Sequence, residues 1–219
     1  MNSSLRHQPK SRPSPPVAPQ PSQLQDLLQE SADRHQHLCP RQVLGARLGL
    51  CGLRTLGLID YRDSLRYVNL NKRLLTIVET DGCAADGLAV TVDCSVGRRT
   101  LRVLDFGKVA ATLVDIVSGR GVRVAPSARS RELAPIYAPD APSRWHAYLA
   151  AYQRIPDREL LVVQQVRLTT PLAQILSKPD ARARCQQCGE EVINEREVRR
   201  DGVVLCRPCA GESYYRLVD

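Results

Sequence analysis

Residues 73–80 read Arg-Leu-Leu-Thr-Ile-Val-Glu-Thr, a short apolar run between charged ends. Its length and its content of Leu, Ile and Val predict a strand buried on both faces. The strand delivers Asp81-Gly82-Cys83 at its carboxyl end, where open sheets commonly build their sites. We therefore expect a sheet whose functional edge lies near Cys83.

Helices are expected on both sides of this strand. Apolar residues at helical spacing begin at Gln23, and a second helix is expected over residues 40–56, opened by a proline. Gly45 and Gly49 stand four apart in that second helix, where another backbone could approach closely. A third, short helix is expected over residues 84–91.

The remaining pattern mixes strands and helices. A β-hairpin pattern covers residues 101–106 and 110–117 with a third strand at 122–124, two helices fall between 126 and 154, and a last strand covers 160–168. Strands clustered in the middle of the chain, with helices before and after, predict an α+β fold.

Three segments follow from this organisation. Residues 1–21 are rich in Pro, Ser and Gln and predict a disordered tail, because such a composition cannot repay the entropy of ordering. Residues 22–179 form the α+β core domain, with mixed helices and sheet. Residues 180–219 form a small appended module.

Four cysteines define that module. Cys185-Gln-Gln-Cys188 and Cys206-Arg-Pro-Cys209 are separated by the spacing of a four-thiolate zinc site. Asp201-Gly202 predicts a hairpin turn between the pairs, and a helix is expected over residues 210–217. A knuckle, a hairpin and a helix make a treble-clef zinc finger, and four thiolates close the coordination sphere, so the zinc should be structural.

A second set of donors lies at residues 35–40, His-Gln-His-Leu-Cys-Pro. In an extended backbone, side chains alternate, so His35, His37 and Cys39 would lie on one side of the chain. Imidazole and thiolate are ligands that zinc and other transition metals prefer, and three ligands leave a position open for water or substrate. This pattern predicts a second metal in the core.

Other residues could complete this site. Cys83 and Cys94 would ligate the metal or act as reactive thiols, and Asp86, one helical turn after Cys83, could orient a histidine or serve as a base. In the alternative interpretation, Cys83 and Cys94 are buried and pack as small hydrophobic residues. The candidate catalytic residues are His35, His37, Cys39, Cys83, Asp86 and Cys94.

The bulk composition limits the compartment and the partners. The formal net charge is +8, but residues 185–219 carry five arginines against seven acids, 5 − 7 = −2, so the zinc module is not the basic part. Nucleic acid is therefore not expected as a partner. No apolar run approaches the length of a membrane span or a signal peptide, and Cys-x-x-Cys pairs suit reduced thiols, so a cytoplasmic protein is expected.

The ordered motifs resemble the FmdE family of formylmethanofuran dehydrogenase proteins. The resemblance covers about residues 25–215 and is carried by His35-x-His37-x-Cys39-Pro40 with Leu44-Gly45, Glu79-Thr80-x-x-Cys83-x-x-Asp86, Cys94-x-x-Gly97, Asp105-x-Gly107-Lys108-x-Ala110 and a C-terminal Cys-x-x-Cys-Gly-Glu. The chain departs from the family pattern at Gln36 and Arg41, where the family usually has glycine. It departs again at Val92-Asp93, where the family has Thr-Gly.

The resemblance implies an α+β core, a homodimer, and a cleft lined by the His-x-His-x-Cys segment and the Cys83 and Cys94 loops, which binds metal or acts on a small-molecule substrate. It assigns no reaction, so enzymatic activity is left open. The first hypothesis is a metal-binding protein with structural zinc in the finger and a second metal or thiol site in the core. The alternative is a regulatory protein whose finger contacts a protein partner, such as the transcription machinery, without catalysis.

Overall fold

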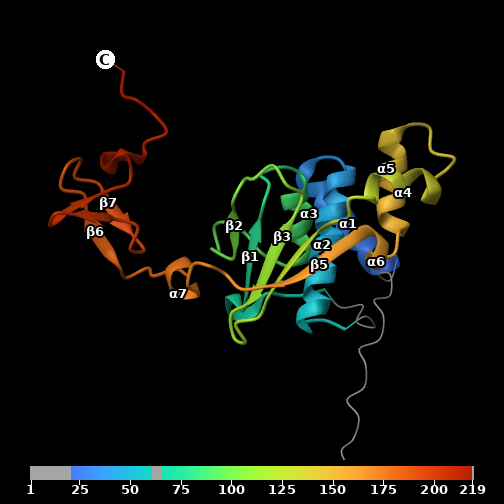
Figure 1. Cartoon of the computed structure of the whole chain (residues 1–219), viewed down its shortest axis with the longest axis horizontal. Coiled ribbons are helices and arrows are strands. Elements are labelled where there is room, and N and C mark those ends of the chain that lie inside the picture. Colours follow the sequence, from blue (N-terminus) through green and yellow to red (C-terminus); the bar gives the residue numbers. More distant parts are fainter. Residues whose placement is uncertain (1–20, 61–65, 219) are drawn as a thin grey trace, which may run out of the picture. The chain divides into compact units, whose positions relative to one another are not determined.

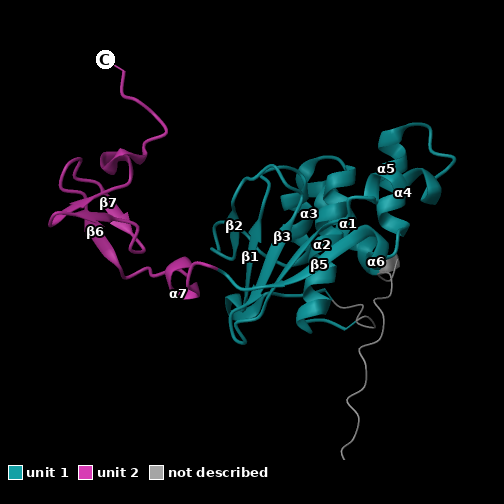
Figure 2. Ribbon diagram, in the orientation of Figure 1, with its two compact units in different colours: residues 1–168 teal, residues 169–219 magenta. Residues whose placement is uncertain are grey.

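The computed structural model describes residues 21–60 and 66–218 of the chain (Figure 1). The expected tail at residues 1–21 lies outside the described residues, apart from Pro21. The chain divides into two compact units, residues 1–168 and residues 169–219 (Figure 2). We describe each unit by itself.

The first unit is built on a five-stranded sheet in the order β2-β1-β3-β4-β5. Only the β1–β2 pair is parallel, and the other pairs are antiparallel. The strands are β1 (Leu74–Val78), β2 (Leu101–Val103), β3 (Ala111–Asp115), β4 (Gly121–Pro126) and β5 (Leu161–Val166). The predicted strand at residues 73–80 is β1, buried along its whole length.

Three helices pack together on one side of the sheet (Figure 1). They are α1 (Pro21–His35), α2 (Pro40–Leu56) and α3 (Ala84–Thr91), which confirms the three helices expected at these positions. α2 contacts the strands β3 and β4 as well as α1 and α3. The core is therefore a helix layer on a sheet.

α2 and α3 cross at very close range, and two glycines permit it. A Cβ atom added at Gly45 would lie 2.1 Å from the Ala84 carbonyl oxygen, and one added at Gly87 would lie 2.1 Å from the Gln42 carbonyl oxygen. Real side chains cannot approach backbone at such distances. The two glycines thus fix the first turn of α3 against the first turn of α2.

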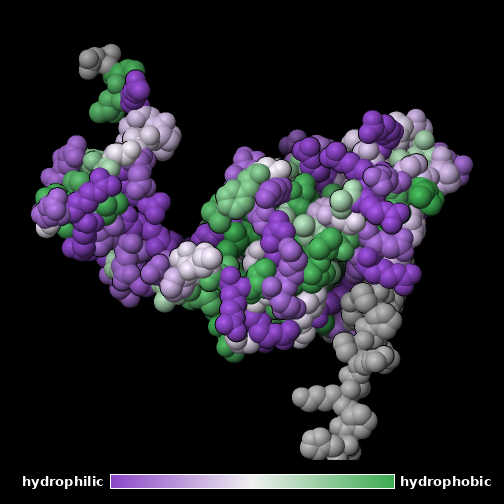
Figure 3. Space-filling view, viewed as in Figure 1, coloured by the Kyte–Doolittle hydropathy of each residue, from purple (hydrophilic) through white to green (hydrophobic). Residues whose placement is uncertain are grey.

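The remaining helices of the first unit follow the hairpin β3–β4. They are α4 (Ser130–Tyr137), α5 (Arg144–Arg154) and the short α6 (Asp157–Leu160), which leads directly into β5. The two helices expected between residues 126 and 154 and the strand expected over 160–168 are therefore present. β5 is an edge strand, and Val162 and Val163 on it are 46% and 42% exposed. Figure 3 shows apolar residues among hydrophilic ones on the visible face of this unit.

The hairpin expected from residues 101–106 to 110–117 is wrong. β2 pairs with β1 in parallel, through a crossover that contains α3, whereas β3 pairs with β1 and β4. The loop after β2 explains the difference. The backbone N–H groups of Phe106 and Lys108 both donate to the Glu79 carbonyl, so the chain wraps the end of β1 instead of turning back on β2.

The second unit contains two small antiparallel ladders. β6 (Arg182–Arg184) pairs with β7 (Glu191–Ile193), and β8 (Val198–Arg200) pairs with β9 (Val203–Leu205). The unit also holds α7 (Leu172–Ile175) and a single π-helical turn, η2 (Pro208–Glu212). The two-residue turn predicted at Asp201-Gly202 is confirmed, since both residues have positive φ.

The helix expected over residues 210–217 is wrong. η2 ends at Glu212, and Gly211 inside it has φ 97°, which no continuing right-handed helix accommodates. Residues 214–218 are exposed and lack regular structure. The treble-clef arrangement depended on that helix, so it is not confirmed.

Candidate functional site

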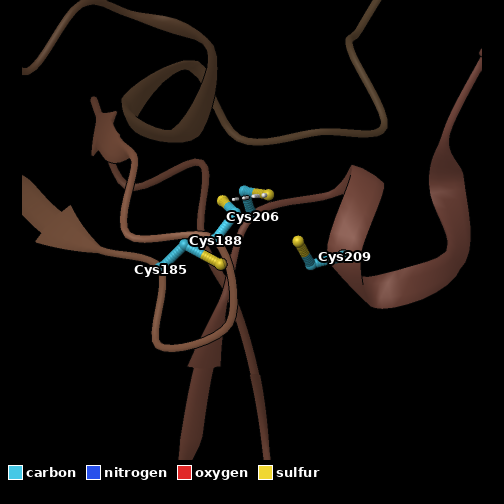
Figure 4. A group of neighbouring side chains, drawn as sticks. All are labelled: Cys185, Cys188, Cys206 and Cys209. Carbon is cyan, nitrogen blue, oxygen red and sulfur yellow. Dashed lines mark hydrogen bonds between the residues drawn. The ribbon is translucent and has the colours of Figure 1, made fainter. Parts of the chain in front are cut away.

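The cysteines Cys185, Cys188, Cys206 and Cys209 converge on one point (Figure 4). Their sulfur atoms all lie within 4.8 Å of one another, and the Cys188 and Cys206 sulfurs are 3.8 Å apart. A tetrahedron with Zn–S bonds of about 2.3 Å has S···S edges of about 3.8 Å. The donor set and its spacing therefore fit a tetrahedral zinc ion.

The turns around the cluster bring backbone donors to the sulfurs. The Cys185 carbonyl accepts from the Gly189 N–H at 3.0 Å, and Gly189 has φ 79°, so the Cys-x-x-Cys-Gly segment closes as a knuckle. Hydrogen bonds from the Cys188 and Cys206 backbone lower the pKa of Cys185 to about 6. The cluster thus stabilises thiolate, the form that binds metal.

Neighbouring thiols act in the opposite direction on Cys209. Its hydrogen bond with the Cys206 side chain, followed by burial, raises its pKa to about 12. Four thiols at this range cannot all ionise without a compensating cation. A divalent metal supplies that compensation, and its binding would release protons.

The predicted core donors start at a joint between α1 and α2. His35 is the last residue of α1, Gln36 has φ 69°, and Cys39 is the extended N-cap residue of α2. The expectation of a uniformly extended segment is therefore wrong, because the left-handed residue breaks the alternation. His35 and His37 still lie close together, with ring centroids 4.8 Å apart.

His35 contacts Asp86 across the α1–α3 boundary. The His35 Nδ1 atom lies 2.8 Å from an Asp86 carboxylate oxygen. This contact fixes the orientation of the ring and leaves Nε2 available. The role expected for Asp86, orientation of a histidine, is compatible with this geometry.

Cys39 and Cys83 form a second, separate pair. Their side chains are hydrogen-bonded to each other although they lie 44 residues apart in the chain, 83 − 39 = 44. Both line a pocket of about 430 Å³. The opposite wall comes from α4 and α5, and the full lining is Cys39, Pro40, Arg41, Leu44, Cys83, Val109, Pro126, Ser130, Arg131, Trp145, Tyr148 and Tyr152.

Buried polar contacts hold Cys39 in place. The Gln42 side chain accepts from the Cys39 N–H at 2.7 Å and donates to the Ser31 hydroxyl and carbonyl at 3.1 Å. Gln42 is fully buried. It therefore ties α1 to the first turn of α2, and the Gly45–Gly87 crossing brings Cys83 to the same place.

The electrostatics of Cys39 favour its neutral form. Burial raises the pKa of the Cys39 thiol, and hydrogen bonds from the Gln42 and Arg41 backbone only partly offset this effect. The contact with Cys83 raises it further. Cys39 is therefore a thiol at neutral pH, and it loses its proton only when a bound group compensates the charge.

Cys94 lies apart from both pairs. It is 4% exposed and belongs to the hydrophobic core, and burial raises its pKa to about 12. It does not line the pocket. Of the two interpretations for Cys94, the buried small side chain matches its environment. Cys51 is likewise in the core, as its position among leucines predicts.

The predicted second metal finds no closed donor set in the described part of the chain. Over residues 21–60 and 66–218, the one group of three or more His, Cys, Asp or Glu side chains gathered closely enough to hold an ion is the four-cysteine cluster. The candidate core residues divide instead into His35, His37 and Asp86, the pair Cys39 and Cys83, and the isolated Cys94.

Sequence reasoning missed the wall opposite the thiols. Arg131, Tyr148 and Tyr152 come from α4 and α5, far from any recognised motif. The amphipathic pattern of α5 was visible in the sequence, but nothing in it tells a helix that lines a pocket from one that only covers the core.

Comparisons with known proteins agree with this division. Residues 34–181 match the family model described as FmdE, molybdenum formylmethanofuran dehydrogenase operon. Residues 180–215 match the prokaryotic dksA/traR C4-type zinc finger. The two matches meet at residues 180–181, whereas the compact units divide between Leu168 and Thr169.

Two individual proteins are similar to the chain. A probable S-adenosyl-L-methionine-binding protein of Archaeoglobus fulgidus is 29% identical over 214 residues, which are 90% of this chain and 56% of that protein. The chain thus spans just over half the length of that relative. An FmdE-like protein of the tungsten formylmethanofuran dehydrogenase type, from Syntrophus aciditrophicus, has a similar fold, with TM-score 0.56, 19% identity, and coverage of 88% of this chain and 95% of that one.

Proposed function

Because the chain belongs to the FmdE family and ends in a C4-type zinc finger, we propose that it is a metal-binding protein with structural zinc in the finger and a thiol-based ligand site in the core. In this proposal, Cys39 and Cys83 act together on a small molecule or ion held in the pocket. The observation that carries it is the contact of these two thiols in the wall of a cavity of about 430 Å³.

The chemistry of two adjacent neutral thiols defines what they bind. Thiolate sulfur is a soft donor, and a thiol with a raised pKa gives up its proton when a soft metal ion or an electrophilic centre takes the sulfur lone pair. A pocket of this size and lining is typical of small-molecule sites. The pair therefore suits capture of a soft centre better than attack by a preformed thiolate.

The structural role of the zinc rests on the burial in the second unit. Among its described residues, 169–218, the buried residues are Cys185, Asn194, Cys206 and Ala210. Two of these are metal ligands, so almost no apolar core exists apart from the cluster. A unit of this kind folds only with a staple.

Phenylarsine oxide tests the paired thiols directly. The reagent forms two As–S bonds with two adjacent thiols and releases one water, so it reports thiols that can act together. We expect the zinc-loaded protein to carry an adduct that joins Cys39 to Cys83, located by peptide mass spectrometry. Cys39→Ala or Cys83→Ala should abolish it, and Cys51→Ala, outside the pocket, should keep it.

Two outcomes would overturn the proposal. They are a native protein that forms no adduct in the core, and an adduct that persists in Cys39→Ala. The name of the A. fulgidus relative makes S-adenosylmethionine the first compound to try as a protecting ligand in the same assay.

A core metal is the second candidate, and one contact favours it. The His35–Asp86 contact at 2.8 Å is the arrangement in which a carboxylate orients a metal-binding histidine. His37 is exposed next to it. In this version a transition metal would bind His35 and His37 with a thiol, and the metal content of a His35→Ala, His37→Ala variant tests it.

The homodimer and the cytoplasmic location stay predictions. In the described part of the chain, no helix has the length and apolar character needed to cross a membrane. Sedimentation equilibrium of the full chain measures the oligomeric state. A homodimer is expected from the family resemblance, and a monomer would contradict it.

A further inference from the structure

We infer that the pocket takes a small organic anion, with its acidic group bound by Arg41 and Arg131 and its planar or apolar part against the aromatic wall of α5. The inference rests on the proposed function, because it names the ligand class of the same pocket. It is carried by the charge and the shape of the lining.

The charge of the lining has one sign. Arg41 and Arg131 both line the pocket, and the lining contains no aspartate or glutamate. Both arginines are exposed, and neither forms an ion pair with a carboxylate of the described residues. A guanidinium that has no protein carboxylate is available for a carboxylate, phosphate or sulfonate of a ligand.

Other arginines of the same unit show the contrast. Arg73 binds Asp115 through two hydrogen bonds of 2.9 and 3.0 Å. Arg123 binds Glu79 in the same bidentate way, at 2.6 and 2.8 Å. These two arginines beside the sheet are thus engaged by carboxylates, whereas the two pocket arginines are not.

The wall opposite the thiols is aromatic. Tyr148 and Tyr152 are stacked with ring centroids 5.7 Å apart and an interplanar angle of 3°, and Trp145 completes the wall while 45% exposed. Leu44, Val109 and Pro126 add apolar surface. Flat aromatic side chains favour a planar or apolar ligand group, and the cavity has room for one ring system with an acidic substituent.

A matched pair of dyes tests the inference without knowledge of the natural ligand. 8-Anilinonaphthalene-1-sulfonate is an aromatic anion, and N-phenyl-1-naphthylamine has the same ring system without the charge. Trp145 is the one tryptophan of the chain, so energy transfer from it reports dye bound near the pocket. We expect the anion to bind the full-length, zinc-loaded protein about tenfold more tightly than the neutral dye.

Variants assign this preference to the two arginines. Arg41→Gln, Arg131→Gln should abolish the preference for the anion while the neutral dye binds as before. The control Arg129→Gln, Arg154→Gln removes the same charge outside the lining and should keep the preference. Trp145 is present in both variants, so the readout is the same.

The outcomes separate this inference from the proposed thiol chemistry. Cys39→Ala, Cys83→Ala should lose the arsenical adduct but still bind the anion, so failure of one proposal leaves the other tested. Equal affinity of the two dyes for the wild-type protein would overturn the inference. So would a preference for the anion that survives the Arg41 and Arg131 substitutions or disappears in the control.

Discussion

The two units differ in what holds them together. In the first unit, α1, α2 and α3 cover a five-stranded sheet, and leucine and valine side chains from both layers are fully buried. In the second unit, two short ladders enclose four cysteines and almost no other buried side chain. One chain thus combines a fold stabilised by apolar burial with a fold stabilised by metal coordination.

This difference has a consequence for function. A site on the first unit is positioned by packing, as the Gly45–Gly87 crossing positions Cys39 and Cys83. The cysteines of the second unit are themselves the structure, so they are not free to react. The units should therefore respond differently to chelators, to core substitutions and to acid.

Zinc removal should have the largest effect, and on the second unit alone. Chelation of the zinc-loaded protein, or Cys185→Ser with Cys206→Ser, removes a binding free energy of about 10 kcal/mol or more, which is the folding energy of such modules. We expect hydrogen exchange over residues 181–212 to become fast while α2 and β3 keep their protection. Loss of protection in both units together would contradict the separation.

Closing the α2–α3 crossing should have the next largest effect, on the first unit alone. Gly45→Ala places a Cβ atom 2.1 Å from the Ala84 carbonyl oxygen, so the helices must separate, at a cost of about 3 kcal/mol. Urea unfolding of the core measures the loss. The same variant should weaken the arsenical adduct, because the two thiols move apart.

The matched control for this substitution is Gly97→Ala. A Cβ atom there meets nothing within 4 Å. We expect its effect to stay below about 0.5 kcal/mol. If both alanine variants cost the same, the close crossing does not set the stability of the core.

Acid should weaken the first unit through Asp115. The hydrogen bond from Arg73 lowers the pKa of this carboxyl from 3.8 to about 2. Because the folded-state value is below the unfolded one, the contribution is complete above about pH 4 and is lost as the pH falls through about 2. Since Arg73 is half exposed, we expect about 1 kcal/mol at neutral pH.

Asp115→Asn isolates this contribution. The stability difference from wild type, measured by urea unfolding, should be present at neutral pH and vanish near the folded-state pKa. Asp140→Asn, in an exposed loop, serves as the control and should show no such pH dependence. A difference for Asp115→Asn that is independent of pH would contradict the assignment.

Relief of backbone strain at Gln36 should have the smallest effect. Gln36 has φ 69°, a conformation that glycine adopts without the Cβ penalty. We expect Gln36→Gly to stabilise the first unit by about 0.5 kcal/mol, because the entropy that glycine adds to the unfolded chain offsets part of the gain. Gln29→Gly inside α1 should instead destabilise it by about 1 kcal/mol. If the two variants change stability in the same direction, the strain assignment is wrong.

The sequence predicted the elements better than their pairing. The apolar run of β1, the proline that opens α2 and the Asp201-Gly202 turn are local signals, and each marks its element correctly. The partner of β2 is not a local property. It depends on where the loop after β2 finds acceptors, which the structure places at the Glu79 carbonyl.

The candidate sites show the same limit. The spacing of the four cysteines was sufficient, because a tetrahedral site requires little beyond two turns that converge. The core motif predicted a uniformly extended segment, which Gln36 breaks. Gln36 and Asp93, the latter at φ 44°, both stand where the family usually has glycine, so these departures mark backbone positions and not ligands.

The most direct test of this account is the zinc content per chain, measured by plasma mass spectrometry on untagged protein. It compares wild type with Cys185→Ser, Cys206→Ser and with Cys39→Ala, Cys83→Ala. The account predicts that the finger variant loses its zinc while the core stays folded, and that the pocket variant holds as much zinc as wild type. A pocket variant that loses metal relative to wild type would contradict the account and favour the core metal site.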